Sequence, residues 1–463
     1  MSNIVDNLLL FLSSIVDRIA IFLSITVDNI QIRCHDDVIG RTAVNHDILK
    51  NVIFDQHRTI REFDIVRRPR YTFDINADYI VVGLRRAGKS TLLYSLVRDL
   101  IESGKDWNQI IYINFEDDRL EGFTSSDFND IVSLQKELSD REGWFFLDEV
   151  QNIEGWEKFA RRLADGKEHV FITGSNSRML SSEMEQRLGG RYLTKYVTPY
   201  TFAEYLDAAK VKRDEAALFS TKGQGEIRRA FNEFFVSGGL PETLILKNRR
   251  EYLSNVYSKI LLGDIASRNN IRNINALRIM IKKMAESVKD ELSYSKLYNI
   301  LKTIGIKISK DSVIDYISLT LQSYLIFRVD NYLSSFVERE TRPKYYFADN
   351  GILNLFLISE EPRLLENLTA VILQRKYGSG FYYLKTDALD IDFFVPDTGE
   401  VIQVAYSVEN ISSERETESL VKAAKTVKEA RSFRIITFEE EKNLTVDGVD
   451  ITVTPVWKYA LGE

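Results

Sequence analysis

Short apolar runs alternate with helical stretches between residues 74 and 197, a pattern typical of a parallel β-sheet joined by crossover helices. The five runs that predict strands are Tyr79–Val82, Ile110–Ile113, Trp144–Leu147, His169–Ile172 and Tyr192–Tyr196. This part of the chain is therefore expected to have an α/β fold.

The pattern changes to a helical periodicity between residues 202 and 272, interrupted at Ser237–Pro241. The interruption contains two glycines and a proline, which break a helix. We therefore expect these helices, before and after the break, to form one small helical lid or linker domain. Three helices and two strands follow, and together these elements make a winged helix. They are predicted at Ile274–Val288, Ser295–Lys302, Asp311–Tyr324, Leu325–Val329 and Pro343–Phe347.

The C-terminal part has the order helix, three strands, helix, strand, which predicts an independent α/β domain. Its elements are expected at Leu364–Tyr377, Phe381–Leu384, Ile391–Val395, Val401–Tyr406, Glu414–Ala430 and Ser432–Thr437. The whole pattern divides the chain into an apolar N-terminal helical segment (1–50), an α/β core (51–200), a helical lid (201–272), a winged helix (273–348) and the C-terminal domain (349–463).

The composition is that of a folded soluble protein, with 44% hydrophobic and 28% charged residues among 463. A net charge of −7 argues against a chain that coats nucleic acid over its whole surface, but it is compatible with a basic face on one domain. The single cysteine, Cys34, excludes an internal disulfide and a cysteine-based metal cluster, and only four histidines argue against a zinc site. These features predict a cytoplasmic protein.

The first thirty residues raise the question of a membrane segment, because the apolar runs Leu8–Leu12 and Ile19–Leu23 lie close together. Asp17 and Arg18 separate them, whereas a spanning helix needs roughly 20 apolar residues without charge at its centre. We therefore expect no integral membrane segment, but an amphipathic helical segment that packs on the body of the protein or on another subunit. Peripheral contact with a membrane is the alternative.

A phosphate-binding loop is predicted at Gly83–Thr91, which matches the pattern glycine, four residues, glycine, lysine, then serine or threonine. The loop follows an apolar strand and precedes a helix over Leu92–Glu102. Glycines let consecutive backbone N–H groups surround phosphate oxygens, and the positive end of the helix points at them. Lys89 is expected on the β and γ phosphates of ATP and the Ser90 hydroxyl on Mg²⁺. The expected ATP-binding residues of the loop are Gly83, Arg86, Gly88, Lys89, Ser90 and Thr91.

An acidic pair, Asp148 and Glu149, follows the strand Trp144–Leu147 and supplies the second half of the predicted site. Asp148 is expected to bind Mg²⁺ directly or through water, and Glu149 to orient and polarise the attacking water as a general base. A merely structural acidic turn is the alternative. One strand lies between the loop strand and the acidic strand in sequence, so the core resembles the additional-strand, catalytic-glutamate division of P-loop ATPases.

Two further groups are candidates for contacts with the γ phosphate. Ser175 or Asn176, after the fourth strand, is the candidate sensor of that phosphate, although an ordinary polar turn explains the same residues. Arg191, favoured over Arg187, is the candidate arginine finger, supplied in cis or by a neighbouring subunit. A surface salt bridge is the alternative for Arg191, and a finger supplied in trans requires a homo-oligomer.

The chain resembles the predicted AAA+-like ATPases of archaea and bacteria, in which an ATPase domain precedes a winged helix and a nuclease-like C-terminal domain. The resemblance covers nearly the whole chain after about residue 50. It implies ATPase activity, and it implies DNA-associated work or nucleotide-controlled switching as roles. The motifs that carry it are Gly83–Thr91, Leu147–Gln151, Ile172–Ser175, Leu188–Arg191, Thr198–Phe202, Gly238–Glu242 and Asp392–Phe393.

The resemblance also implies a restriction-endonuclease-like core, whose chemistry needs an aspartate and a glutamate-x-lysine pair to hold Mg²⁺ and activate water. Glu366 and Asp392 match, but Gln403–Ala405 replaces the pair, and alanine cannot do the work of the lysine. Asp387 and Asp390 offer an unusual metal arrangement, or simply a solvated strand end. We therefore predict that this domain is catalytically degenerate and binds DNA or a partner, or only completes the fold.

Positive charge is concentrated between residues 249 and 344, where 17 lysines and arginines stand against 10 acidic residues. This asymmetry is typical of a nucleic-acid contact, so we expect the winged helix to contact DNA phosphates. A winged helix that contacts a protein is the alternative. The residues expected to contact phosphates are Lys302, Lys307, Lys310, Arg339, Arg342 and Lys344.

The leading functional hypothesis is an ATPase that couples hydrolysis to DNA binding or remodelling. The main alternative is a nucleotide-controlled signalling or defence switch that acts on a protein partner. A metal-dependent nuclease gated by ATP is a third hypothesis, against which Ala405 argues.

Overall fold

The computed structural model of the chain describes residues 46–176, 179, 182–408 and 412–462. The predicted apolar segment up to residue 45, and Cys34 with it, lies outside these described residues. The described chain begins with helix α2, His46–Glu62. In this part of the chain, none of the helices has the length and apolar character needed to cross a lipid bilayer.

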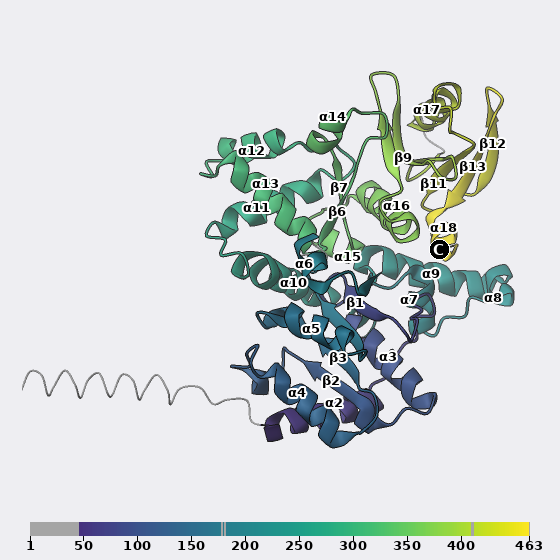
Figure 1. Cartoon of the computed structure of the whole chain (residues 1–463). Helices are drawn as coiled ribbons and strands as arrows, with labels where there is room; N and C mark the ends of the chain where they lie inside the picture. The colour runs from purple at the N-terminus through teal and green to yellow at the C-terminus, as the bar shows by residue number, and fades with distance from the viewer. Residues whose placement is uncertain (1–45, 177–178, 180–181, 409–411, 463) are drawn as a thin grey trace, which may run out of the picture.

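A five-stranded parallel sheet follows α2 (Figure 1). Its strands are β1 (Asp78–Val82), β2 (Ile110–Asn114), β3 (Trp144–Asp148), β4 (His169–Gly174) and β5 (Tyr192–Tyr196). Their order is β2-β3-β4-β1-β5, and every neighbouring pair is parallel. The predicted α/β fold and its five strands are confirmed. In space, β4 separates the loop strand β1 from the acidic strand β3, whereas in sequence the intervening strand is β2.

Helices cover both faces of this sheet, because the strands of a parallel sheet are apolar on both sides. The main ones are α3 (Lys89–Glu102), α4 (Phe128–Leu138) and α5 (Trp156–Asp165). Within β1, Val81 belongs to the apolar cluster that contains α3, and Val82 belongs to the cluster of α4 and α5. A shorter helix, α6 (Ser182–Leu188), precedes β5.

The predicted helical lid follows β5. It contains α7 (Phe202–Ala208), α8 (Glu215–Phe219), α9 (Thr221–Ser237), α10 (Arg249–Lys259) and a π-helical segment, η6 (Ile260–Ser267). The break after α9 lies where the sequence predicts it. A Cβ atom on Gly239 would lie 2.4 Å from the Tyr200 carbonyl oxygen, and the Tyr200 N–H donates to the Gly239 carbonyl at 2.7 Å. Glycine is therefore required here, because two backbone segments from different parts of the chain meet.

Three helices and an antiparallel strand pair follow the lid. They are α11 (Ile274–Glu286), α12 (Tyr294–Thr303), α13 (Lys310–Gln322), β6 (Ile326–Val329) and β7 (Lys344–Phe347). These elements agree with those predicted, and their assignment as a winged helix stays a prediction. The stretch between the strands, predicted only as polar, contains a short helix, α14 (Phe336–Thr341), started by a capping box of Ser335 and Glu338. Helix α15 (Asn350–Leu353) then packs against α9 and α10.

A six-stranded mixed sheet of order β12-β13-β11-β10-β9-β8 forms the C-terminal part. Its elements are α16 (Glu361–Tyr377), β8 (Tyr382–Lys385), β9 (Asp390–Val395), β10 (Glu400–Val404), α17 (Ser412–Thr426), β11 (Ser432–Thr437), β12 (Lys442–Val446), β13 (Val449–Pro455) and α18 (Val456–Leu461). The last three were missed, because the prediction ended at Thr437. Asp447 and Gly448, with φ of 49° and 78°, form the tight turn between β12 and β13, and an Asp-Gly pair is the usual signal for such a hairpin.

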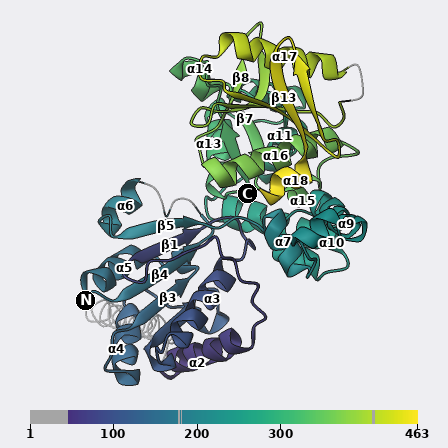
Figure 2. The ribbon, with the colours of Figure 1, turned by 90° about the vertical axis from the view of Figure 1, so that its right-hand side faces the viewer.

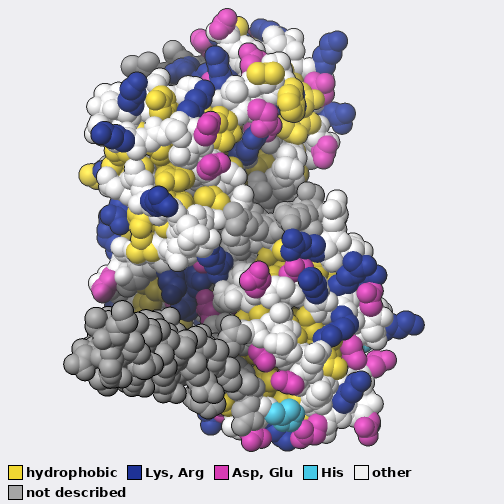
Figure 3. All heavy atoms as spheres, turned by 60° about the vertical axis from the view of Figure 1, so that its left-hand side comes forward, with side chains coloured by type: hydrophobic (Ala, Val, Ile, Leu, Met, Phe, Trp, Pro, Cys, Tyr) yellow, Lys and Arg dark blue, Asp and Glu magenta, His cyan; other side chains and the backbone are white. Residues whose placement is uncertain are grey.

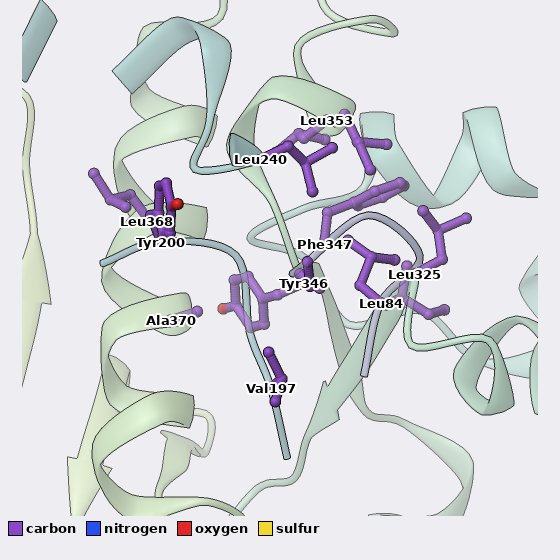
Figure 4. Packing of buried hydrophobic residues seen from close by; sticks show 14 of the residues in the cluster. Leu84, Val197, Tyr200, Leu240, Leu325, Tyr346, Phe347, Leu353, Leu368 and Ala370 are labelled. Atoms are coloured by element: carbon purple, nitrogen blue, oxygen red, sulfur yellow. The ribbon is translucent and has the colours of Figure 1, made fainter. Parts of the chain in front are cut away.

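One apolar cluster connects the α/β core, the lid and the C-terminal half (Figure 4). It includes Leu84 of the predicted phosphate loop, Leu240 after α9, Phe347 at the end of β7 and Leu368 of α16. Figure 2 shows the lid helices beside the parallel sheet and below the C-terminal part. Leu84 of the predicted phosphate loop therefore packs in the same apolar cluster as residues of the predicted lid and of the C-terminal half.

Candidate active site

The backbone of residues 83–88 has the shape that a phosphate-binding loop requires. Gly83 has φ of 147°, and a Cβ atom there would lie 2.0 Å from the Val197 carbonyl oxygen. Gly88 has φ of 93° and caps α3, which begins at Lys89 rather than at the predicted Leu92. Arg86 has φ of 65°, unusual for a residue other than glycine. The loop therefore lies between β1 and the positive end of α3, where anions bind.

The side chain of Lys89 is buried and points back at the loop. Its ammonium group donates to the carbonyl oxygens of Gly83 at 3.3 Å and Leu84 at 3.4 Å. The same nitrogen lies 3.6 Å from a carboxylate oxygen of Glu149. The loop lysine and the acidic strand, 60 residues apart in sequence, thus meet at one point.

Asp148 ends β3 and is fully buried beside the start of α3. Its carboxylate accepts hydrogen bonds from the hydroxyls of Tyr112 at 2.8 Å, of Thr173 and of Ser90. Burial, with the charge of Glu149, raises the pKa of Asp148, and the three hydrogen bonds oppose that rise. A buried carboxylate and a hydroxyl side by side are hard oxygen donors, so Asp148 and Ser90 fit the ligands of a Mg²⁺ ion.

Glu149 directly follows β3 with φ of 52°, a strained conformation that turns its side chain toward Lys89. Its carboxylate accepts hydrogen bonds from the Gln151 amide and, at 3.3 Å, from the Ser175 hydroxyl. Burial by itself raises the pKa of Glu149, but the charge of Lys89, the Gln151 bond and the charges of Arg85 and Arg268 outweigh it and lower the pKa. Glu149 is therefore ionised at neutral pH, as a proton acceptor must be.

The other predicted γ-phosphate residues lie in two different places. Ser175 and Asn176 are buried at the end of β4, and Ser175 touches Glu149. Arg191 precedes β5, whose first residue Tyr192 pairs with the first residue of β1. Arg191 is thus five strand positions, or roughly 16 Å, from the loop end of the sheet. Its guanidinium lies 2.6 Å from Asp165, so the structure does not bring Arg191 to the phosphate loop of its own chain.

Ion pairs that the sequence did not predict connect the phosphate loop to the predicted lid, and one of them uses Arg86, which was expected on ATP. Arg85 of the loop makes a two-point contact with Asp264 of η6, at 2.8 and 3.1 Å. Arg86 lies 3.2 Å from Glu242, whose other oxygen accepts a hydrogen bond from Tyr252 at 2.8 Å. These acids follow the loop by more than 150 residues, so no local sequence pattern could have paired them with the loop.

Tyr112 and Thr173, which hold Asp148, were also missed, although strand register offered a signal. Asn114 of β2 pairs with Asp148, and the β3–β4 pair Leu147 and Ile172 puts Thr173 beside it. Thr173 thus lies next to the end of the acidic strand, whereas Tyr112 lies two positions before Asn114 in the middle of β2.

The predicted degenerate nuclease site contains a compact charge cluster. Lys344 of β7 lies 3.8 Å from Glu366 of α16 and 3.9 Å from Asp392 of β9. Gln403 accepts a hydrogen bond from the Asp392 N–H at 2.7 Å and donates one to Glu416. Among the described residues, no group of three or more histidines, cysteines or acids is placed to hold a metal ion. The lack of nuclease activity stays a prediction.

The cluster corrects one part of the predicted DNA contact. The side chain of Lys344 is only 2% exposed and faces Glu366, so it cannot reach a DNA phosphate. Arg339 donates to the backbone carbonyls of Ser334 and Tyr332. The sequence alone could not reveal these internal contacts, because a lysine or arginine can lie on the buried or the exposed face of a strand or helix. The remaining candidates are exposed: Lys302, Lys307, Lys310 and Arg342.

Comparisons with known proteins match parts of the chain to two described family models. A family model described as "AAA domain" matches residues 76–206, and a model of a domain of unknown function matches residues 228–362. The second match runs across the predicted boundary between lid and winged helix.

Two curated relatives align with most of the chain. An uncharacterised protein from Methanocaldococcus jannaschii is 30% identical over 89% of this chain and 95% of its own length. An uncharacterised Haemophilus influenzae protein is 26% identical over 82% of this chain and 93% of its own.

Solved structures with some likeness include a Walker-type ATPase of Pyrococcus abyssi and the Aeropyrum pernix ORC1 protein in complex with DNA. The first covers 66% of this chain and 95% of its own, at 13% identity and a TM-score of 0.34. The second covers 71% of this chain and 93% of its own, at 15% identity and a TM-score of 0.26.

Proposed function

The chain belongs to the same family as the Methanocaldococcus jannaschii relative, with an AAA domain at residues 76–206, and from this premise we propose that it binds ATP and hydrolyses it to ADP and phosphate. The observation that carries the proposal is the convergence of Lys89 and Ser90 at the start of α3 with Asp148 and Glu149 at the end of β3. Lysine, hydroxyl, buried aspartate and ionised glutamate are the groups that phosphoryl transfer to water requires.

Hydrolysis follows from the roles that these side chains can take. Glu149 accepts a proton from a water molecule as the water oxygen forms a bond to the γ phosphorus. The bond from the γ phosphorus to the oxygen bridging to the β phosphate breaks, and its electron pair leaves with ADP. Lys89 balances the charge that develops on the β and γ oxygens. The proton on Glu149 then passes to solvent, which restores the carboxylate.

Ser90 and Asp148 are the residues that would hold Mg²⁺. The ion would supply charge neutralisation at the β and γ oxygens of ATP. The buried carboxylate of Asp148, whose pKa is raised by burial, is well suited to a compensating cation. Gly83, Arg86, Gly88 and Thr91 complete the phosphate loop in this proposal, with Ser175 and Asn176 on the γ side. Arg191 would act only on the site of a second copy, which makes a homo-oligomer part of its assignment.

Hydrolysis would be transmitted through the lid. Arg85 and Arg86 connect the loop to Asp264 and Glu242, and Leu84 belongs to the apolar cluster that includes residues of β7 and α16. A change in the loop therefore acts directly on the three-helix part, the proposed winged helix. We keep DNA binding or remodelling as the proposed output, and a nucleotide-controlled switch on a protein partner as its rival.

The surface offers one specific observation in favour of DNA. Lys302, Lys307 and Lys310 are all exposed within one short stretch around the α12–α13 connection. On the face shown in Figure 3, however, acidic side chains are interspersed with lysines and arginines over both halves of the molecule. Any DNA contact would therefore be local and would bind phosphates rather than read bases.

The test is steady-state ATP hydrolysis by the wild type and by Glu149→Gln. Glutamine keeps an oxygen that accepts from Gln151 and Ser175, but it cannot take a proton. Turnover should fall about 10²- to 10⁴-fold while ATP binding persists. A variant that hydrolyses ATP at the wild-type rate would remove Glu149 from the reaction.

The same assay with single-stranded, duplex and four-way-junction DNA separates the two outputs. Acceleration of wild-type turnover by one DNA form supports the DNA-coupled enzyme. Slow turnover that no DNA changes supports the switch.

A further inference from the structure

The phosphate loop contains a second cationic side chain near Lys89, that of Arg85, two residues after Gly83. The Lys89 ammonium, which belongs at the β and γ phosphates, lies 3.4 Å from the Leu84 carbonyl and 3.6 Å from Glu149. The side chain of Arg85 contacts Glu116, just after β2, and its charge acts on the carboxylate of Glu149. Arg85 is thus on the Glu149 side of the loop, where the γ phosphate would lie. Its side chain is 12% exposed, whereas that of its neighbour Arg86 is 60% exposed and turns to Glu242.

The lid holds the Arg85 guanidinium in one orientation. Asp264 of η6, itself 3% exposed, accepts from Nε at 2.8 Å and from Nη2 at 3.1 Å. Glu116, just after β2, accepts from Nη2 at 3.1 Å. A guanidinium has five N–H bonds, and contacts through Nε and Nη2 do not use the two on Nη1. The hydrogen bond and charge of Asp264, with the charges of Glu116 and Glu149, outweigh the effect of burial and raise the pKa of Arg85, so it stays charged.

We propose that Arg85 is a catalytic residue that binds the γ phosphoryl group of ATP within the same chain, and that Asp264 is the positioning residue that aims it. The inference rests on the proposed ATP hydrolysis and gives the site an arginine that comes from its own loop. An arginine at the transferred group stabilises the charge on its equatorial oxygens as the bridging bond breaks. Since Asp264 belongs to the lid, the position of the lid decides whether that arginine is in place.

This assignment differs from the prediction made for Arg191. Arg191 lies at the other end of the strands from the loop and is paired with Asp165, so it requires a second copy of the chain. Arg85 requires none. If Arg191 acts in trans, turnover per chain should depend on protein concentration, and mixing two inactive variants should restore activity. If Arg85 acts within its own chain, neither effect should be seen.

The test compares turnover and nucleotide affinity of Arg85→Ala, Arg85→Lys and Asp264→Asn in the full chain. We expect Arg85→Ala to lower kcat at least about 100-fold, while the Kd for ATP changes by no more than about threefold. Millimolar guanidinium, far below denaturing concentrations, should restore part of the activity of Arg85→Ala. Asp264→Asn should lower kcat about tenfold with KM almost unchanged. Arg85→Lys keeps the charge but not the fork, so it should remain impaired.

Arg213→Ala is the matched control, because Arg213 makes the same two-point contact with Asp207, at 2.9 and 2.9 Å, on the lid away from the site. It should keep wild-type kcat and KM. Mixing Arg85→Ala with Glu149→Gln should give only the sum of their separate rates, whereas a residue acting in trans would restore activity.

Three outcomes would overturn the inference. They are a kcat within about threefold of wild type for Arg85→Ala, a loss of ATP binding instead of turnover, and recovery of activity on mixing. A wild-type chain without turnover would overturn the proposed function itself and this inference with it. Since the wild-type rate is measured first, the two failures are distinguishable.

Discussion

A buried ion pair connects the phosphate loop to the first lid helix, and its loss should be costly. The side chains of Arg68 and Glu204 are 4% and 7% exposed and meet at 2.9 and 2.8 Å in a two-point contact. Arg68 also donates to the carbonyl oxygens of Ala87 in the loop and Thr198 after β5, at 3.1 and 2.9 Å. The same guanidinium thus holds the loop, the strand exit and α7 together.

The size of the effect follows from what Arg68→Met would leave behind. Removing one partner of a buried pair costs about 3 to 5 kcal/mol, because the other charge stays buried. Arg70, 3.0 Å from Glu204, would remain as a partner, so we expect the lower end, about 3 kcal/mol. Burial raises the pKa of Glu204, but the hydrogen bond and charge of Arg68 outweigh it and lower the pKa in the wild type.

The pH dependence of the penalty has a definite sign. In the wild type, Glu204 stabilises the fold above its unfolded pKa, and this contribution is lost as the pH falls through its lowered folded pKa. In Arg68→Met the carboxyl group accepts a proton more readily, so protonation relieves the buried charge at a higher pH. The difference between the two proteins should therefore shrink when the pH is lowered from neutral toward the ordinary pKa of glutamate.

Urea unfolding followed by tryptophan fluorescence measures this difference, since Trp107, Trp144 and Trp156 belong to the parallel-sheet part of the chain. Arg68→Met with Glu204→Gln should cost less than the sum of the single changes, with a coupling of about 1.5 kcal/mol or more. A penalty for Arg68→Met below about 1 kcal/mol, or one that does not shrink at lower pH, would refute the reasoning.

Two other predictions concern backbone shape and titration. Gly83→Ala should lower the melting temperature and abolish ATP binding, because the new Cβ would lie 2.0 Å from the Val197 carbonyl oxygen. Gly225→Ala in α9 is the matched control: its Cβ would have nothing within 4 Å, so this variant should melt no lower than wild type. Equal melting temperatures for the two variants would contradict this account. Burial and the charge of Asp392 raise the pKa of Glu416 to about 7 from 4.5, so the folded state binds its proton more tightly and stability falls as the pH rises between these values, by at most about 3 kcal/mol. Glu416→Gln should remove that loss, so the variant should melt higher than wild type at pH 8 but not at pH 4. The prediction fails if the melting temperatures of variant and wild type differ by the same amount at both pH values.

The sequence predicted the parallel sheet well because its signal is local. Each strand is a short apolar run, and burial on both faces demands this at every position. The observed bounds of β1 and β3 extend the predicted ones by one residue each, Asp78 and Asp148. The hairpin β12–β13 was missed for the opposite reason. β12 is the edge strand and β13 lies next to it, and both strands mix exposed with half-buried or buried residues, so neither is a continuous apolar run.

The phosphate loop and its acidic pair were also predictable. The loop depends on backbone dihedral angles that glycine permits, and those angles are a property of the residue itself. Ser175 was a candidate because it directly follows a strand of the predicted sheet, as the acidic pair follows another. Ser175 does contact Glu149. Arg191 was a candidate by its order in the chain alone, and strand register puts it at the end of the strands that is away from the loop.

What the sequence by itself determined is therefore the five parallel strands, most of the other elements as far as Thr437, the phosphate loop and the two acids at the end of β3. Only the tertiary structure decided which charges pair across the molecule: Arg85 with Asp264, Arg68 with Glu204, and Lys344 with Glu366. The physical reason is one of range. Dihedral preferences and apolar periodicity act over a few residues, whereas an ion pair depends on where packing places two side chains that are far apart in sequence.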